Sequence, residues 1–213
     1  MIERATGLIL RTRLLTETSL IVQWLTREQG RIATVAKGAR RPQSPFRGKL
    51  DLCYQADFSF VRSRRSDLHI LREVQLTETH PALREDLSRL EQAAYAVALI
   101  ELATETDTPV PAFHALLSDF LGHLDRRRAA SAVVMAFELR VLAESGLEPE
   151  PERAALSAGS REILRHLRAG GWEPLGSLRL SPAQSRELGV FLEAFLRDHL
   201  GKVPEIRATA LAG

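Results

Sequence analysis

One short stretch of the sequence has the composition of a phosphate-binding loop. The stretch "VAKGARRPQSPFRGKL", residues 35 to 50, carries cationic side chains and no acidic one on a frame of glycines and prolines. Arginine donates paired hydrogen bonds to phosphate oxygens, and glycine lets a backbone approach a phosphate chain closely. The pattern predicts contact with a polyanion through Lys37, Arg40, Arg41, Arg47 and Lys49.

Other residues could extend this charged field if the fold brings them to the same face. Arg11 and Arg13 lie on the first expected strand and Arg31 on the third, and we predict that all three bind nucleic acid. Phe46, inside the loop, either stacks on a base or anchors the loop to the domain. A later turn adds Arg62, Arg64 and Arg65 as further candidates.

The sequence shows no pattern of catalytic or metal-binding residues. Six histidines are scattered, and none pairs with a carboxylate or cysteine at the spacing of metal ligands. The single cysteine, Cys53, excludes an internal disulfide and a cysteine-rich zinc site, and its apolar strand predicts a core residue. The nucleophile elbow, the P-loop and the dinucleotide fingerprint are all missing. We therefore predict no enzyme activity, no metal and no cofactor.

Charge divides the chain into two parts of opposite character. Residues 1 to 75 hold 14 Arg and Lys against 7 Asp and Glu, whereas residues 76 to 213 hold 15 against 20. Such asymmetry indicates a basic module for nucleic acid or an anionic surface, joined to a module with another role.

The hydrophobic pattern changes near the same boundary. Apolar runs at 6 to 15, 19 to 26, 31 to 39, 51 to 61 and 67 to 77 predict five strands, with a hairpin turn closed by Gly30. Five short strands in about 75 residues are typical of a small closed barrel. Trp24 alternates with Val22 and Leu20, so we expect it in the core.

The period becomes helical from Pro81 onward. We expect helices over about 83 to 102, 112 to 125 and 131 to 145, the last one followed by Gly146, and a linker over 147 to 159. Ser181, Pro182 and Gln184 predict a capping box at the start of a helix that runs to about Leu200. No signal peptide or membrane span is visible, so we expect a soluble cytoplasmic protein.

The stretch "ETSLIVQWLTREQGRIATVAKGARRPQSPFRGKL", residues 17 to 50, resembles the N-terminal signature of the RecO family of bacterial recombination mediators. The closing segment "LGKVPEIRA", residues 200 to 208, is similar to the end of that family's sequences. The resemblance implies an α+β multidomain protein, with a five-stranded OB-fold barrel over residues 1 to 78 that binds DNA and an all-α helical domain over 79 to 213 for protein interaction.

The resemblance also implies a function. Family members bind single- and double-stranded DNA, anneal complementary strands, and cooperate with RecR, single-strand-binding protein and, indirectly, RecA, which implies association with the bacterial nucleoid. Many members carry a four-cysteine zinc module in the helical domain. This chain has only Cys53, so we predict no zinc.

Two other classes of function stay open at this point. A non-enzymatic adaptor would use the basic barrel to bind RNA or an anionic surface. A nuclease would need carboxylates or metal ligands that cluster only in the folded chain.

Overall fold

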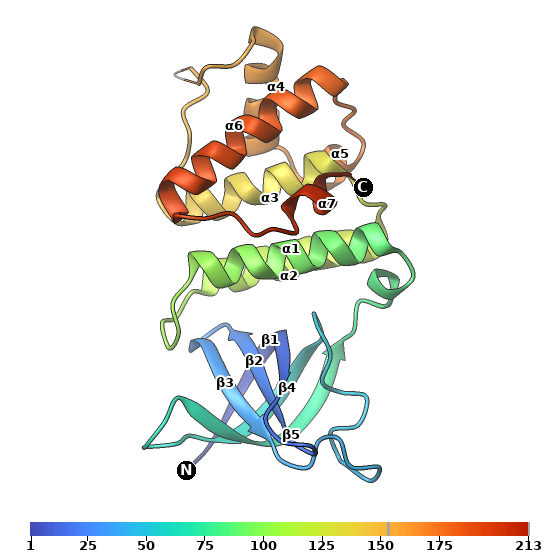
Figure 1. The fold of residues 1–213 in the computed structure, drawn as a ribbon, viewed down its shortest axis with the longest axis vertical. Coiled ribbons are helices and arrows are strands. Elements are labelled where there is room, and N and C mark those ends of the chain that lie inside the picture. Colours follow the sequence, from blue (N-terminus) through green and yellow to red (C-terminus); the bar gives the residue numbers. More distant parts are fainter. Residues whose placement is uncertain (153, 213) are drawn as a thin grey trace. The chain divides into compact units, whose positions relative to one another are not determined.

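The chain folds into two compact units, and each is described by itself. A computed structural model describes residues 1–152 and 154–212. The first unit comprises residues 1–80 together with 104–118, and the second comprises residues 81–103 together with the described residues from 119 onward. The first unit contains the strands, and most helical residues belong to the second (Figure 1).

The strands of the first unit close into a barrel. They are β1 (Ile2–Leu14), β2 (Leu20–Thr26), β3 (Gly30–Ala36), β4 (Gln55–Val61) and β5 (Leu68–Glu78). Their order around the barrel is β1-β2-β3-β5-β4, and β1 pairs with both β2 and β4. β3 runs parallel to β5, and the other pairs are antiparallel. This five-stranded Greek-key barrel is an OB-fold, so the predicted fold class is confirmed.

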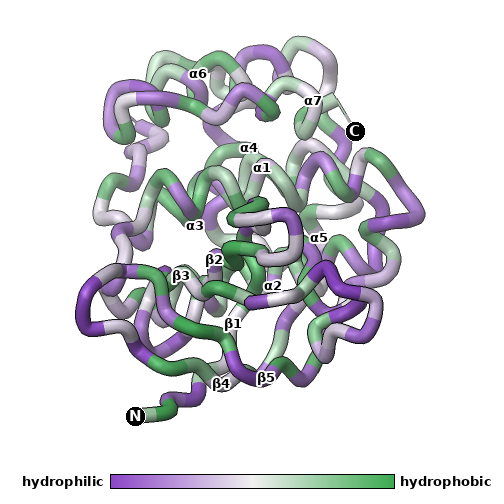
Figure 2. Tube along the Cα trace, turned by 60° about the horizontal axis from the view of Figure 1, so that its bottom comes forward, coloured by the Kyte–Doolittle hydropathy of each residue, from purple (hydrophilic) through white to green (hydrophobic). Residues whose placement is uncertain are grey.

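The barrel interior is built on aromatic side chains. Trp24 is fully buried, stacks on Phe58 with ring centroids 4.0 Å apart, and donates a 2.8 Å hydrogen bond from Nε1 to Thr34 Oγ1. Its predicted core position is confirmed. The indole N–H would be expensive to bury without that acceptor, so Thr34 belongs to the core as well. Figure 2 shows both hydrophobic and hydrophilic residues along the strands of the barrel.

The turn between β2 and β3 requires glycine. Gly30 has a φ of +70°, and a Cβ atom there would lie 1.8 Å from the carbonyl oxygen of Thr108. The neighbouring Arg31 carbonyl accepts a 2.9 Å hydrogen bond from the Asp107 N–H. These contacts explain why residues 104–118, which the sequence places among the helices, belong to the barrel unit.

The fourth strand is shorter than the sequence predicts. It begins at Gln55, because residues 51–54 form a turn in which the Tyr54 N–H donates to the Asp51 carbonyl. Cys53 is buried as expected, but it lies in this turn with a φ of +64° and not in a strand. The apolar run 51 to 61 therefore contains both a turn and a strand.

The second unit is helical. Its elements include η1 (Pro81–Arg84), α1 (Leu87–Ala103), α3 (Ser131–Glu144), α4 (Ala158–Ala169), α5 (Trp172–Gly176), α6 (Pro182–Leu200) and α7 (Arg207–Ala212). α2 (Pro111–Arg126) contributes residues to both units. The central α3 packs against α1, α4, α5, α6 and α7. No helix in the described part of the chain is long and apolar enough to cross a membrane.

The predicted helix signals are largely confirmed. Ser181 and Gln184 form the capping box, and Gly146 follows α3 with a φ of +71°. The expected linker is shorter than predicted, because Ser157 caps α4 and residues 158 and 159 already belong to that helix. Of that linker, Arg153 lies outside the described residues.

A buried charge network joins the C-terminal helix to the helical core. Arg207 Nε and Nη2 donate to the two carboxylate oxygens of Glu138 over 2.7 and 3.1 Å. The hydroxyl of Tyr95 donates to the same carboxylate over 2.5 Å, and burial raises the pKa of that hydroxyl. Gln92 also donates to the Ala210 carbonyl over 3.1 Å. These bonds hold α7 against α1 and α3.

Candidate nucleic-acid interface

The basic stretch between β3 and β4 folds into a series of turns. Its backbone forms successive short-range hydrogen bonds of 3.0 to 3.2 Å: Arg41 to Gly38, Ser44 to Arg41, Arg47 to Ser44 and Lys49 to Phe46. Gly38 and Gly48 have φ values of +66° and +72°, which L side chains rarely adopt. We call residues 37–49 the basic loop. It is an ordered scaffold for its cations.

The basic loop is fastened to the tip of the β1–β2 hairpin, residues 14–19. The Arg40 N–H donates to the Thr18 carbonyl over 3.0 Å, and Arg40 Nη1 donates to the Glu17 carbonyl over 2.9 Å. The Gly38 N–H donates to Ser19 Oγ over 3.3 Å. The Arg40 guanidinium therefore donates one hydrogen bond within the barrel unit, and its positive charge stays exposed at the surface.

Phe46 anchors the basic loop to the barrel. Its side chain is 6 % exposed and packs in the same core cluster as Trp24 and Phe58. The ring lines the hollow that Arg40, Arg41 and Arg47 also line, but most of its surface is enclosed by the barrel, and the stacking role stays a prediction. Of the two roles that the sequence left open, the structure supports anchoring.

Two hollows that share Arg41 are lined by cationic side chains of the basic loop. A hollow of about 610 Å³ is lined by Arg40, Arg41 and Arg47, with Tyr54 and Asp51 on its wall. A second hollow of about 370 Å³ is lined by Lys37 and Arg41 together with residues of the hairpin tip. Arg41 lines both hollows. The side chains of Lys37 and Arg41 donate no hydrogen bond to any described residue, so their donors are available to a ligand.

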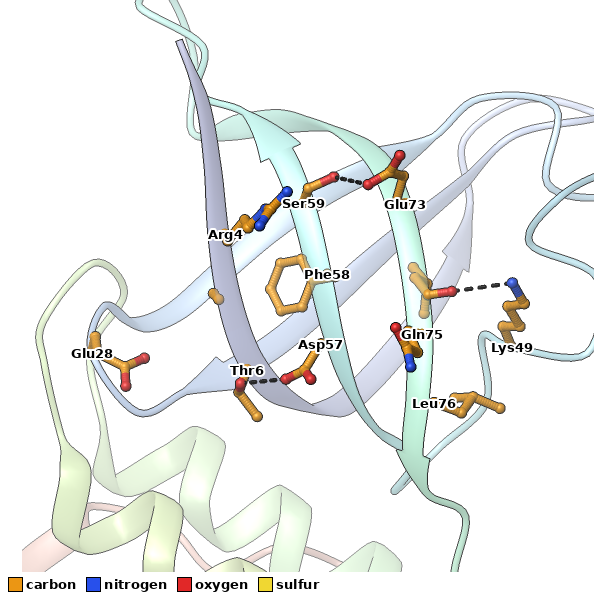
Figure 3. A pocket seen from close by; sticks show the side chains of 12 residues that line it. Arg4, Thr6, Glu28, Lys49, Asp57, Phe58, Ser59, Glu73, Gln75 and Leu76 are labelled. Carbon is orange, nitrogen blue, oxygen red and sulfur yellow. Dashed lines mark hydrogen bonds between the residues drawn. The ribbon is translucent and has the colours of Figure 1, made fainter.

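Lys49 is turned away from these hollows. Its Nζ donates a 3.1 Å hydrogen bond to the Val74 carbonyl, and the side chain lines a different hollow of about 920 Å³ (Figure 3). That hollow mixes charges: Arg4 lies on one strand, and Glu73, which accepts from Ser59 Oγ over 3.2 Å, lies on another. Lys49 therefore contributes to a mixed surface and not to the cationic one.

Arg11 and Arg13 lie on the hairpin that carries the tip. Both are exposed, and their β2 partners are Gln23 and Ile21. A bulge at Leu10 separates this half of β1 from the half that pairs with β4. The two arginines remain predicted DNA contacts, and neither of them lines either hollow.

Arg31 belongs to another part of the barrel. It is half-buried, and Nη2 donates a 2.6 Å hydrogen bond to the Thr104 carbonyl. Arg31 lies near the start of β3 and Lys37 just after its end, a separation of about 20 Å at the rise of an extended strand. The structure therefore separates Arg31 from the basic loop and gives it a structural contact.

The arginines of the β4–β5 turn also lie at the start of β3. Arg62 pairs with Glu3 over 3.0 Å and with Asp107 over 3.6 Å, and its hydrogen bond lowers the pKa of the Glu3 carboxyl. β5 begins at Leu68, which pairs with Ala33 of β3. Because β3 and β5 are parallel, the turn that precedes β5 lies toward the start of β3. The arginines of the β4–β5 turn therefore do not extend the positively charged surface of the basic loop.

The hairpin tip is the part of this surface that the sequence analysis missed. Leu14 and Leu15 are 66 % and 44 % exposed, and Leu15 lines the same hollow as Lys37 and Arg41. The sequence signal for an exposed tip was a pair of adjacent leucines at the end of a strand, followed by the turn-forming Thr16 and Ser19.

Family models match both parts of the chain. The model described as Recombination protein O N terminal matches residues 1–80, and the model described as Recombination protein O C terminal matches residues 84–155 and 148–206. The chain belongs to the RecO family. The basic loop and the hairpin tip lie within the N-terminal match.

Curated RecO proteins align with much of this chain. "DNA repair protein RecO" of Bacillus pumilus is 31% identical over 215 residues, which cover 95% of this chain and 81% of that protein. The protein of the same name from an Anaeromyxobacter species is 29% identical, covering 93% of this chain and 92% of its own. The Myxococcus xanthus protein is 35% identical over 144 residues, 68% of this chain. That alignment spans 59% of the M. xanthus protein, less than two thirds of its length.

The described residues of this RecO chain offer no metal centre. No three His, Cys, Asp or Glu side chains among them are grouped so that they could hold an ion. The single cysteine of the sequence lies in the barrel unit.

Proposed function

We propose that this protein binds single- and double-stranded DNA through the basic loop, anneals complementary strands, and assists RecA loading with RecR on DNA covered by single-strand-binding protein. One observation carries the proposal: an ordered loop on an OB-fold presents Lys37, Arg41 and Arg47 around two adjoining hollows. OB-folds bind single strands by combining a cationic groove with contacts to the bases.

The first step is neutralisation of phosphates. Lysine and arginine side chains release the counterions of the strand, so affinity falls as salt rises. Contact with about 5 phosphates of a single strand predicts a slope near −3.5 for log affinity against log salt concentration. Because the cations contact the backbone and not the base edges, we expect little sequence preference.

Annealing follows from the same surface. Two complementary strands repel each other through their phosphates, and a shared cationic surface lowers that repulsion until bases pair. The step breaks no covalent bond and needs neither nucleotide nor metal. We therefore propose a non-enzymatic role.

The two parts of the chain divide the work in this proposal. The barrel, residues 1 to 78, binds DNA, and the helical region, residues 79 to 213, binds the protein partners. The charge asymmetry supports the division, since the excess of cations lies within the first 75 residues.

Annealing of two labelled complementary oligonucleotides tests the proposal. The full chain is added without nucleotide over a series of salt concentrations, and the rate of duplex formation is read by energy transfer between the labels. The account predicts acceleration that weakens as salt rises. A folded protein that leaves the rate unchanged at every salt concentration contradicts it.

Parallel binding assays separate the competing functions. Selective binding of RNA, or of anionic vesicles without DNA, would favour the adaptor. Metal-dependent cleavage of the oligonucleotides would show that the protein is an enzyme and would overturn the non-enzymatic role.

A further inference from the structure

The β1–β2 hairpin ends in two exposed leucines whose position the barrel core does not explain. Leu14 is 66 % exposed and Leu15 is 44 % exposed. Single exposed apolar residues are common on protein surfaces, and Leu87 and Val190 in the helical unit are examples. Leu14 and Leu15 differ because they lie at the hairpin tip that the basic loop contacts, and Leu15 lines a hollow together with Lys37 and Arg41.

The tip holds the leucines in a fixed place. The N–H groups of Leu15 and Thr16 donate to the Ser19 carbonyl over 3.0 and 3.3 Å, and the Ser19 N–H donates to Thr16 Oγ1 over 3.1 Å. The next residue pair, Leu14 and Leu20, closes the strand ladder. An apolar group on such a closed turn loses little conformational freedom when it binds a ligand.

The same tip is bound to the basic loop. Arg40 donates to the carbonyls of Glu17 and Thr18, so the leucines and the cations keep one arrangement. Leu15 forms part of the wall of the 370 Å³ hollow, and Lys37 and Arg41 form another part. The hollow therefore joins an apolar wall to a cationic wall.

That combination matches one nucleotide unit of a DNA strand. A phosphate bound by Lys37 and Arg41 would bring the attached base toward the apolar wall. Apolar side chains such as leucine are known to press between bases and unstack them. A lipid headgroup would satisfy the cations, but a closed hairpin tip offers only two leucines for membrane contact.

We infer that Leu14 and Leu15 contact the bases of an unpaired DNA strand whose phosphates lie on Lys37 and Arg41. This inference rests on the proposed function and adds base-contacting residues to it. The contact holds bases apart from their neighbours in the strand, which leaves their pairing edges open to a complementary strand.

Fluorescence anisotropy with two strands of equal charge tests the inference. One labelled oligonucleotide carries bases, and the other has the same number of phosphates with abasic sugars. The proteins are the wild type, Leu14→Ser/Leu15→Ser, and Leu87→Ser as a control for loss of an exposed leucine elsewhere. Circular dichroism and urea unfolding check that each variant folds.

The double variant should bind the base-carrying strand about tenfold more weakly than the wild type, because an apolar contact of this size is lost. Its affinity for the abasic strand and its salt slope should be unchanged, and Leu87→Ser should match the wild type. Equal affinity of the double variant and the wild type for the base-carrying strand would overturn the inference, as would equal losses on both strands.

The proposed function fails in a different way. If the wild type binds neither strand in a salt-dependent manner, DNA binding itself is wrong, and the base contact falls with it. If binding is salt-dependent but the leucines do not matter, only the base contact is wrong. A tip that docks a protein instead of DNA belongs to this second outcome.

Discussion

Arg40 fastens the basic loop to the hairpin tip through the carbonyl oxygen of Glu17, which accepts a 2.9 Å hydrogen bond from its guanidinium. The backbone N–H of Arg40 adds a 3.0 Å bond to the Thr18 carbonyl. Arg40 therefore helps to fix the position of the basic loop at the hairpin tip, in addition to contributing a charge to the surface.

Loss of the Arg40 guanidinium should loosen the loop. Arg40→Gln keeps the backbone hydrogen bond from residue 40 to Thr18 but removes the guanidinium hydrogen bond to the Glu17 carbonyl. Amide hydrogen exchange over residues 36–48 should therefore speed up about tenfold. Hydrogen exchange with mass spectrometry measures this. Arg41→Gln removes the same charge from a side chain with no hydrogen bond to a described residue, so its exchange should match the wild type. Equal protection in both variants would contradict the fastening role.

Phe46 should affect stability and not base recognition. Phe46→Ala removes a buried ring from the barrel core, and we expect a loss of about 3 to 5 kcal/mol in the free energy of unfolding, measured in urea. Phe46→Leu keeps most of the buried volume and should bind single-stranded DNA within about twofold of the wild type. A folded Phe46→Leu protein with strongly reduced DNA affinity would contradict this expectation and support the stacking role.

The buried pair of Arg207 and Glu138 should be essential to the helical unit. Arg207→Met leaves the Glu138 carboxylate buried, with only Tyr95 among the described residues as a hydrogen-bond donor, and we expect a loss of about 3 to 5 kcal/mol. The exposed pair of Arg127 and Glu173 provides a control, since Arg127→Met should cost under about 1 kcal/mol.

A double variant separates the charge penalty from lost packing. Glu138→Leu/Arg207→Met removes both buried charges, and its free energy of unfolding should return toward that of the wild type. If it is as unstable as Arg207→Met alone, packing of α7 and not the unpaired carboxylate determines the loss.

His123 should make the helical unit sensitive to acid. The side chain is buried, neither ring nitrogen has a hydrogen-bond partner among the described residues, and burial lowers its pKa below the ordinary value, although Glu173 partly opposes the shift. The folded protein therefore keeps His123 neutral at a pH where the unfolded chain binds a proton. Stability is unaffected above about pH 7 and falls as pH drops below about 6.5.

A leucine at this position should weaken the acid sensitivity. His123→Leu removes two unpaired polar atoms, so the free energy of unfolding should rise by about 1 kcal/mol at neutral pH and fall less between pH 7 and pH 5. His114, whose pKa burial also lowers, accounts for part of the remaining slope. A wild-type protein with constant stability over that range would contradict the neutral, buried state of His123.

The sequence predicts the barrel and most helices because their signals are local. Alternation placed Trp24 in the core, and Ser181 with Gln184 marked a helix start three residues apart. Helix α4 was not predicted, since its buried positions Ser160, Leu164 and Leu167 are few among charged neighbours.

The candidate site was predicted in part, for a related reason. The five loop cations were visible as a cluster, but their separate roles depend on acceptors far away in the chain. Arg40 reaches the carbonyl of Glu17, and Lys49 reaches that of Val74. Backbone carbonyls occur at every residue, so no sequence pattern marks the ones that capture an arginine or a lysine.

The salt dependence of single-strand binding tests the central claim most directly. Lys37→Gln/Arg41→Gln removes two cations with available donors, and Arg64→Gln/Arg65→Gln removes two exposed cations at the other end of β3. The loop variant should bind every sequence more weakly, and its log affinity slope should be smaller by about 1.4, because each phosphate contact contributes about 0.7. The turn variant should keep the wild-type slope. An unchanged slope in the loop variant, or an equal change in both, would contradict the claim that the basic loop holds the DNA.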